Sequence, residues 1–111
     1  MQPRYNLWLE VDGEVTFSLW RAELLRAVAA TGSISAAAVQ LGVPYRTAWQ
    51  KIHEMETRLG CKLVETQTGG RHGGGARLTP IAEEYLDRFT RFAADMERFV
   101  ADAFEANFDP S

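Results

Sequence analysis

Residues 33 to 60 constrain the fold of this chain most, because they predict two helices joined by a tight turn. The first helix carries three consecutive alanines at positions 36 to 38, whose small side chains let a neighbouring helix approach closely. Gly42 can adopt the left-handed backbone conformation that ends a helix. Pro44 suits the start of the second helix, since it lacks only an N–H that the first turn leaves unbonded. The segment is therefore predicted to be a helix-turn-helix.

The second helix, predicted over residues 45 to 59, has two distinct faces. Its apolar side chains recur at three- and four-residue spacing and are expected to face inward. They are Ala48, Trp49, Ile52, Met55 and Leu59. The outward face consists of Arg46, Thr47, Gln50, Lys51, His53 and Glu54. An exposed helix that begins with arginine, threonine and glutamine is suited to contact base edges in a DNA major groove.

The net charge of −3 would disfavour DNA binding if it were spread evenly along the chain, but it is not. Residues 1 to 32 carry three basic and four acidic groups, whereas residues 33 to 78 carry six basic and three acidic groups. Residues 79 to 111 carry three basic and eight acidic groups. Positive charge is thus concentrated on the helix-turn-helix and the glycine-rich loop behind it, where phosphates would lie.

A β-hairpin is predicted before the helix-turn-helix. Residues 5 to 11 alternate between apolar and more polar positions, which is the period of a half-buried strand. The aspartate–glycine pair at positions 12 and 13 is a strong signal for a two-residue hairpin turn. Residues 14 to 17 can form the return strand, with Val15 and Phe17 on one face.

Serines mark the starts of the first two predicted helices. Ser18 can cap a helix that runs to about Ala30. The inward face of this helix includes Leu24, Leu25 and Val28. Either Ser33 or Ser35 can cap the next helix, and the sequence leaves both alternatives open. Either hydroxyl could also bond a DNA phosphate, because helix N-termini attract anions.

A second hairpin, with a glycine-rich tip, is predicted over residues 63 to 78. Strand segments at residues 63 to 66 and 77 to 78 flank a loop with five glycines between positions 69 and 75. A flexible linker is the alternative interpretation of this loop. The flanking strands and the basic residues at the tip favour a wing that contacts the DNA backbone or minor groove. The expected backbone contacts are Ser33, Ser35, Lys51, Arg71, His72 and Arg77.

The last predicted element is a long helix, opened by a threonine cap at Thr79 and a first-turn proline. From Thr79 to Phe104 it would extend about 39 Å, at ~1.5 Å per residue. One face carries an apolar, largely aromatic stripe. Internal packing is the alternative interpretation, but a dimer interface is favoured because so much unpaired aromatic surface would promote aggregation. The expected interface residues are Tyr85, Phe89, Phe92, Met96, Phe99 and Val100.

Other classes of protein have little support in the sequence. No apolar run approaches the ~20 residues that cross a bilayer, and the N-terminus lacks a signal peptide, so we expect a cytoplasmic protein. Cys61 is the single cysteine and has only two histidines as possible companions. The glycine-rich loop lacks the Gly-Lys-Ser/Thr ending that grips nucleotide phosphates. We therefore predict no enzymatic activity, no metal site and no cofactor.

Two stretches of the chain resemble the N-terminal DNA-binding domain of the molybdate-responsive ModE regulators, and more distantly the LysR-type winged helix-turn-helix. They are GSISAAAVQLGVPYRTAWQKIHEME and LVETQTGGRHGGGARLT, within a similarity that covers roughly residues 18 to 82. The resemblance implies a winged helix domain that dimerises through its terminal helices and binds a palindromic site in double-stranded DNA. The implied base contacts are Tyr45, Arg46, Thr47 and Gln50, with the wing around Arg71. Thr66 stands where the family often has arginine.

The resemblance also suggests how the chain is organised. Full-length members bind molybdate in a separate C-terminal domain, and this chain ends at Ser111 without one, so we expect a stand-alone protein that does not bind molybdate directly. We predict a mainly α fold with small β (α+β), in which residues 1–78 bind DNA, 79–106 form the dimerisation helix and 107–111 are a flexible tail. The leading hypothesis is a homodimeric, sequence-specific transcriptional regulator. The alternative is an interaction protein that pairs with a full-length regulator without binding DNA itself.

Overall fold

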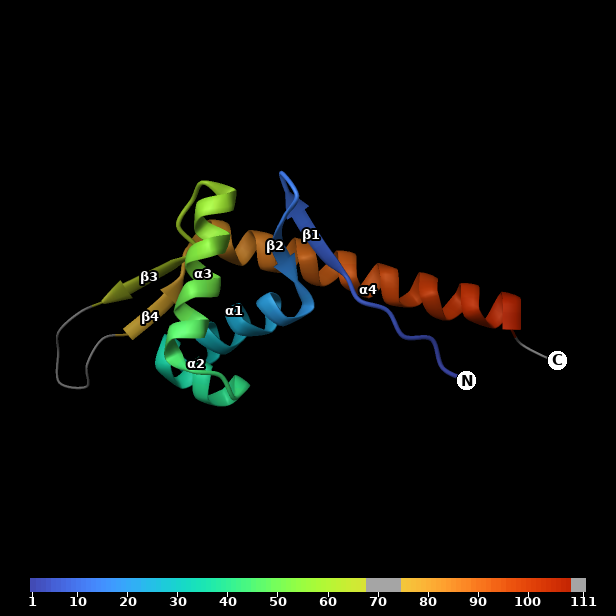
Figure 1. Ribbon diagram of the computed structural model, residues 1–111, viewed down its shortest axis with the longest axis horizontal. Helices are drawn as coiled ribbons and strands as arrows, with labels where there is room; N and C mark the ends of the chain where they lie inside the picture. The colour runs from blue at the N-terminus through green and yellow to red at the C-terminus, as the bar shows by residue number, and fades with distance from the viewer. Residues whose placement is uncertain (68–74, 109–111) are drawn as a thin grey trace.

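The computed structural model describes residues 1–67 and 75–108, and within these ranges it contains four helices and two antiparallel two-stranded sheets. The order is β1 (Trp8–Val11), β2 (Glu14–Ser18), α1 (Leu19–Thr31), α2 (Ile34–Leu41), α3 (Tyr45–Leu59), β3 (Val64–Gln67), β4 (Gly75–Leu78) and α4 (Pro80–Phe108). The first seven elements form the body of the molecule. Within it, β3 and β4 pair to form the base of the wing (Figure 1). This arrangement confirms the predicted winged helix-turn-helix with an N-terminal hairpin and a long last helix.

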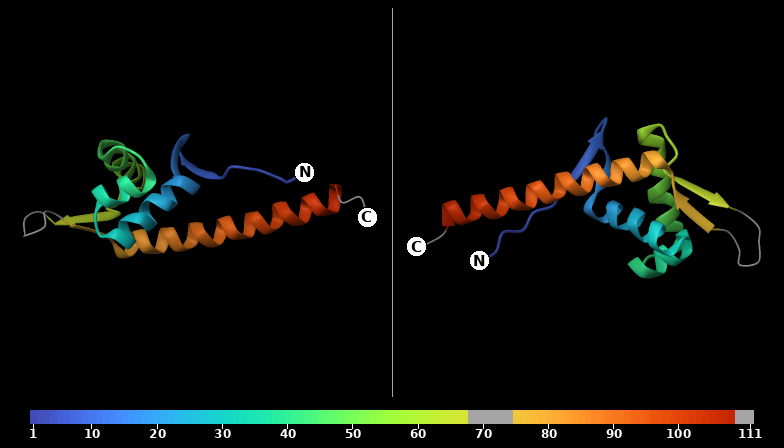
Figure 2. Two further views of the ribbon diagram at one scale, coloured as in Figure 1. Left: turned by 90° about the horizontal axis from the view of Figure 1, so that it is seen from below. Right: turned by 180° about the vertical axis from the view of Figure 1, so that it is seen from behind.

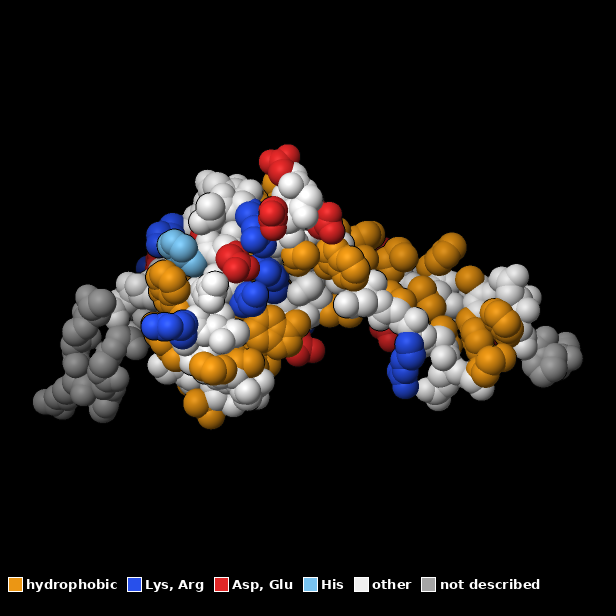
Figure 3. Space-filling view, in the orientation of Figure 1, with side chains coloured by type: hydrophobic (Ala, Val, Ile, Leu, Met, Phe, Trp, Pro, Cys, Tyr) orange, Lys and Arg blue, Asp and Glu red, His pale blue; other side chains and the backbone are white. Residues whose placement is uncertain are grey.

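Helix α4 crosses the body and continues well beyond it, which makes the molecule 62 Å long but only 28 and 22 Å across (Figure 2). Apolar side chains remain visible along the protruding part (Figure 3). The helix ends at Phe108, two residues beyond the predicted end, so the first part of the predicted tail is helical. The rest of that tail lies outside the described residues. None of the described helices combines the length and hydropathy needed to cross a bilayer.

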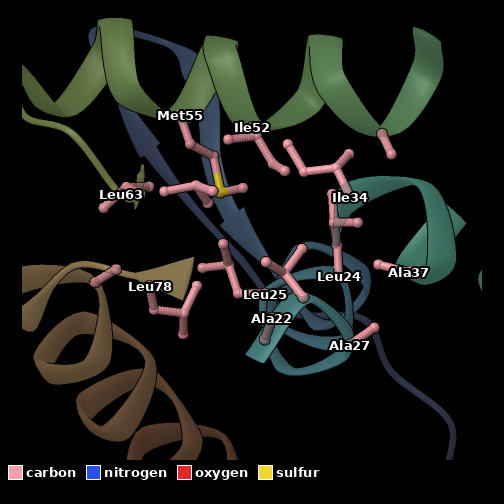
Figure 4. Close-up of a cluster of buried hydrophobic side chains, with 14 of the residues drawn as sticks. Ala22, Leu24, Leu25, Ala27, Ile34, Ala37, Ile52, Met55, Leu63 and Leu78 are labelled. Atoms are coloured by element: carbon pink, nitrogen blue, oxygen red, sulfur yellow. The ribbon is translucent and has the colours of Figure 1, made fainter. Parts of the chain in front are cut away.

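The hydrophobic core lies where α1, α2, α3 and the start of β3 meet (Figure 4). Leu24, Leu25 and Val28 of α1 are fully buried, as predicted, and Met55 of α3 and Leu63 complete the centre of the cluster. Burying each of these side chains contributes about 1.5 to 3 kcal/mol. This shared core holds the two helices of the helix-turn-helix at a fixed angle to each other.

The helix ends follow the sequence signals. The hydroxyl of Ser18 caps α1 by accepting a hydrogen bond from the N–H of Arg21 at 3.1 Å. The hydroxyl of Ser33 accepts from the N–H of Ala36 at 2.9 Å, so Ser33 rather than Ser35 caps α2. Gly42 ends α2 in the left-handed region, with φ 70°. The turn between α2 and α3 therefore has the geometry that the sequence predicts.

The N-terminal hairpin departs from the predicted alternation. Its turn has positive φ at both Asp12 and Gly13, as predicted. However, β1 begins only at Trp8, and all four of its residues are exposed rather than half-buried. A register shift in the pairing of β1 with β2 leaves Thr16 as an extra residue, which bends the strand. As a result Thr16 is buried together with Phe17, while Val15 is only half-buried.

Candidate nucleic-acid interface

The wing is attached to the helix-turn-helix at its base. The backbone N–H of Ala76 in β4 donates to the carbonyl oxygen of Gly32, which ends α1, at 2.7 Å. Gly75 lies against the same oxygen, since a Cβ there would be 3.4 Å from it. On the other strand, one carboxylate oxygen of Glu56 accepts from the N–H groups of Leu63 and Val64 at 2.9 and 3.2 Å. These bonds fix the direction in which the wing leaves the body.

The four predicted base-contact residues all lie within the first two turns of α3. Tyr45, Arg46 and Gln50 are exposed, and Thr47 is half-buried. Pro44 precedes the helix with extended ψ and provides no side-chain cap. The N-terminal half of α3 therefore presents a mixed aromatic, basic and amide surface to solvent.

The predicted backbone contacts are distributed around this surface. Ser33 is engaged as the cap of α2, whereas Ser35 is exposed beside it. The amino group of Lys51 lies 3.8 Å from Glu54. Arg77 on the wing pairs with Glu65 at 3.1 Å, and both side chains are largely exposed, so the pair is weak. Arg71 and His72 lie outside the described residues.

The prediction that Trp49 faces inward is wrong, because this residue is 46% exposed. Successive residues of a helix are rotated by about 100°, so Trp49 lies about 90° from the face formed by Ala48, Ile52 and Met55. It belongs to the edge of the apolar stripe, where spacing alone cannot distinguish core from surface. Its ring stacks on His53, with centroids 4.7 Å apart and planes inclined by 11°.

Trp49 and Tyr45 line a groove of about 300 Å³ between the start of α2, the exposed side of α3 and the wing. Tyr45, Trp49 and His53 are spaced one helical turn apart, so the three rings form a row along α3. The other polar lining residues include Ser33, Ser35, Thr66 and Gln67. This row is not among the predicted contacts, although the four-residue spacing of the three rings in the sequence indicates it.

The prediction that Glu54 lies on the outward, exposed face of α3 is also wrong, because its side chain is only a quarter exposed. Its Oε2 lies 3.0 Å from the guanidinium of Arg21 in α1 and 3.7 Å from that of Arg58 in α3. Arg58 also donates to the carbonyl oxygen of Val15 and pairs with Glu14 at 3.4 Å. This ionic network joins the N-terminal hairpin, α1 and the outer side of α3.

Arg21 is the buried member of the network. Its side chain is only 8% exposed, and its Nη1 has no hydrogen-bond partner among the described residues. A buried guanidinium is tolerated only if a carboxylate compensates its charge. Glu54 therefore holds α3 against α1 and sets the position of the helix that carries the candidate base contacts.

The residues predicted for a dimer interface fall into two groups. Phe89 is only 3% exposed and stacks on Phe17 of the same chain at 5.6 Å, and Tyr85 contacts the same ring at 5.8 Å. Farther along α4, Phe92 and Phe99 are exposed, and Met96 and Val100 are half-buried. The first group anchors α4 to its own body, whereas the second begins with Phe92 at the edge of the body and continues beyond it.

Residues 19–83 match the family model described as bacterial regulatory helix-turn-helix protein, lysR family. The chain is 38% identical over 93 residues to the molybdenum-pterin-binding protein MopB of Rhodobacter capsulatus, covering 82% of this chain and 34% of that protein. It is 36% identical over 93 residues to the DNA-binding transcriptional dual regulator ModE of Escherichia coli, covering 84% of this chain and 36% of that protein. The chain thus spans about a third of the length of these relatives.

Solved structures show the same fold. The DNA-binding domain of CbnR, solved in complex with DNA, superposes with a TM-score of 0.62 and 25% identity, covering 78% of this chain and 94% of that one. The DNA-binding domain of BenM, in complex with catB site 1 DNA, superposes with a TM-score of 0.59 and 20% identity, covering 82% of this chain and 97% of that one. At this lower identity the BenM similarity concerns the fold alone.

Proposed function

The chain belongs to the LysR-type family of bacterial regulatory helix-turn-helix proteins, and from this premise we propose that two copies together bind one palindromic site in double-stranded DNA. The helix-turn-helix is that of a DNA-binding transcriptional regulator of the ModE and LysR type. The observation that carries the proposal is the exposed N-terminal half of α3, which no other described element covers.

In the proposed complex, α3 enters the major groove. Tyr45, Arg46, Thr47 and Gln50 contact base edges, because arginine pairs with guanine and glutamine pairs with adenine in that groove. Trp49 joins them, since its exposed ring can contact the methyl group of thymine. The stacking of Trp49 on His53 limits its rotation and so reduces the entropy lost on binding.

The sugar–phosphate backbone is contacted on both sides of α3. Ser35 lines the groove described above, and Lys51 lies on the other side of α3. The N-terminus of α2 directs its N–H groups and positive dipole end toward anions. The wing, including Arg77 and the predicted contacts Arg71 and His72, follows the backbone or the minor groove. Ser33 contributes through the backbone of α2, because its hydroxyl already serves as the cap.

The proposed homodimer is formed by α4. Tyr85, Phe89, Phe92, Met96 and Phe99 lie on one face of the helix, which the body covers only as far as Phe89 and Ala93. A parallel partner on that face would place its own body in the space that the first body occupies. An antiparallel pair avoids this collision by placing the two bodies at opposite ends. Residues 1–78 then serve DNA binding, and α4 serves pairing.

Selection of bound sequences from a random DNA pool with the purified chain tests this function. We expect a palindrome whose half-sites are about one helical turn, or a multiple of it, apart. Binding should weaken steeply with salt, because the contacts release counterions from phosphates. Arg46→Ala should cost about 1 to 3 kcal/mol of binding free energy and relax the preference at one base position. Recovery of no consensus, or unchanged binding by Arg46→Ala, would contradict the assignment of α3.

The alternative function predicts a different result in the same experiments. An interaction protein that works by pairing with a full-length regulator would form dimers through α4 but show no salt-sensitive affinity for DNA. Light scattering on the purified chain, combined with a DNA titration at two salt concentrations, separates the two functions.

A further inference from the structure

We propose that, in the homodimer, the N-terminal hairpin of each copy packs against the end of its partner's α4. This inference rests on the proposed homodimer and assigns an occupant to two apolar surfaces that the α4 pairing does not cover. One surface is the outer side of β1 with the residues before it. The other is the pair of phenylalanines at the end of α4.

The first surface is unusual for a strand next to a core. Trp8, Leu9 and Val11 of β1 and Tyr5 before it are all exposed. Leu9 and Val11 lie on the face of β1 that Phe17 shares across the hairpin, whereas Trp8 lies on the other face with Glu10, to whose carboxylate its indole N–H donates at 2.7 Å. The exposed face with Leu9 and Val11, next to Phe17, is therefore the contact surface.

The second surface lies at the far end of α4. Phe104 and Phe108 stack on each other, with centroids 5.3 Å apart. Both lie about 100° or more around the helix from the stripe that begins at Tyr85. A partner helix that covers the stripe therefore leaves this pair uncovered on one flank.

Antiparallel pairing brings the two surfaces together. If the two helices cross between Met96 and Phe99, the centre of the protruding stripe, then Phe108 of one copy lies opposite residues 84 to 90 of the other. That part of α4 is where Phe17 packs on its own chain, so the partner's helix end meets the body there. Leu9 is the cross-strand neighbour of Phe17, which makes β1 the adjacent surface.

The path of the chain agrees with this placement. The residues before β1 leave the body in the same direction as the protruding part of α4 (Figures 1 and 2). An antiparallel partner helix that lies along this part of α4 therefore runs beside both β1 and the N-terminal segment.

The area required for a stable dimer supports the same conclusion. At ~200 Å² per aromatic side chain, the exposed fractions of Phe92 (41%) and Phe99 (67%) give about 220 Å² on each copy. A stable interface buries about 800 Å² per partner. Tyr5 (39%) and Phe108 (60%) add about 200 Å² at the same value. The hairpin contact thus nearly doubles the aromatic area that pairing can bury.

The contact would also link dimerisation to DNA binding. The hairpin that receives the partner's helix is joined to α3 through Arg58, which bonds the carbonyl of Val15 and pairs with Glu54. A partner helix on the hairpin therefore restricts the element that positions α3.

Cross-linking between differently tagged chains tests the contact. Cys61→Ala removes the single cysteine, after which one chain carries Leu9→Cys and the other Phe104→Cys. The two are mixed to exchange subunits and treated with a short bismaleimide. The control partner carries Asp102→Cys, which is exposed on the opposite flank of α4. Met96→Cys on both chains reports the α4 pairing itself.

We expect Leu9→Cys to cross-link to Phe104→Cys several-fold more than to Asp102→Cys. Cross-linking at Met96→Cys without any between the hairpin and Phe104→Cys would refute the hairpin contact and leave the proposed dimer standing. A chain that is monomeric by light scattering would refute both.

A single substitution provides a second, independent measurement. Leu9→Ser should raise the dimer dissociation constant several-fold, as the loss of a packed apolar side chain from an interface does. Val39→Ser is the matched control, because it removes an exposed apolar side chain from α2, away from both surfaces. An equal, small change in both variants would refute the contact, provided that circular dichroism shows both to be folded.

Discussion

Glu54→Gln is predicted to destabilise the protein strongly, although Glu54 lies on the helix that the sequence assigns to the surface. The substitution preserves the size of the side chain but removes the charge that compensates Arg21 at 3.0 Å. Breaking a fully buried ion pair costs about 3 to 5 kcal/mol, and an exposed pair contributes about 0 to 1. Because Arg21 is buried and Glu54 is a quarter exposed, we expect a loss of about 2 to 3 kcal/mol.

The matched control is Glu65→Gln on the wing. The Glu65–Arg77 pair has nearly the same separation, 3.1 Å, but both side chains are largely exposed. Loss of the Glu65–Arg77 pair should cost less than about 1 kcal/mol. The two variants therefore compare ion pairs of nearly the same separation that differ in burial. Urea denaturation followed by circular dichroism measures both variants, at one protein concentration because dimerisation would contribute to stability.

A double variant separates charge from packing. In Arg21→Met/Glu54→Leu neither charge remains, and apolar side chains of similar size fill the space. Replacing a buried pair in this way is often neutral or stabilising, so we expect most of the lost stability to return. If Glu54→Gln cost no more than Glu65→Gln, the claim that the network positions α3 would be refuted.

Five further substitutions test other parts of the structure. Ser33→Ala should cost about 1 kcal/mol of stability through the lost cap, whereas Ser35→Ala should cost less than half of that in the same urea assay. Phe89→Ala should destabilise the monomer by about 3 to 5 kcal/mol because it opens a cavity. Phe99→Ser should leave the thermal midpoint of a dilute sample nearly unchanged, but it should shift the mass measured by light scattering toward that of the monomer. Trp49→Ala should weaken binding to the selected DNA about tenfold without changing the salt dependence, as measured by fluorescence anisotropy.

Local signals in the sequence were sufficient to predict most of the fold. Ser18, Gly42 and Thr79 cap or end helices within one residue of the predicted positions, because each acts on backbone groups only a few residues away. Asp12 and Gly13 form the predicted turn for the same reason. Features that depend on neighbours close in sequence can be inferred from spacing and residue type alone.

The errors concern contacts between residues far apart in the chain. The partner of Glu54 is Arg21, 33 positions away, and no pattern within α3 indicates that a buried cation lies opposite. Trp49 shares the spacing of buried residues, yet the neighbouring wing leaves its side open. The bulge at Thr16 arises from the pairing of β1 with β2, which a period-2 pattern in either strand cannot reveal.

The stripe on α4 shows most directly why a periodic pattern cannot decide between a core and an interface. Phe89 and Phe99 occupy the same face of one helix and have the same chemistry, so their sequence signals are equivalent. The difference lies in the length of the body, which reaches Phe89 through Phe17 and ends before Phe99. A contiguous exposed apolar patch marks an interaction surface, and the part of the stripe beyond the body is such a patch. This is the ground on which we propose that a second copy of the chain covers it, with the exposed hairpin beside it contributing to the same contact.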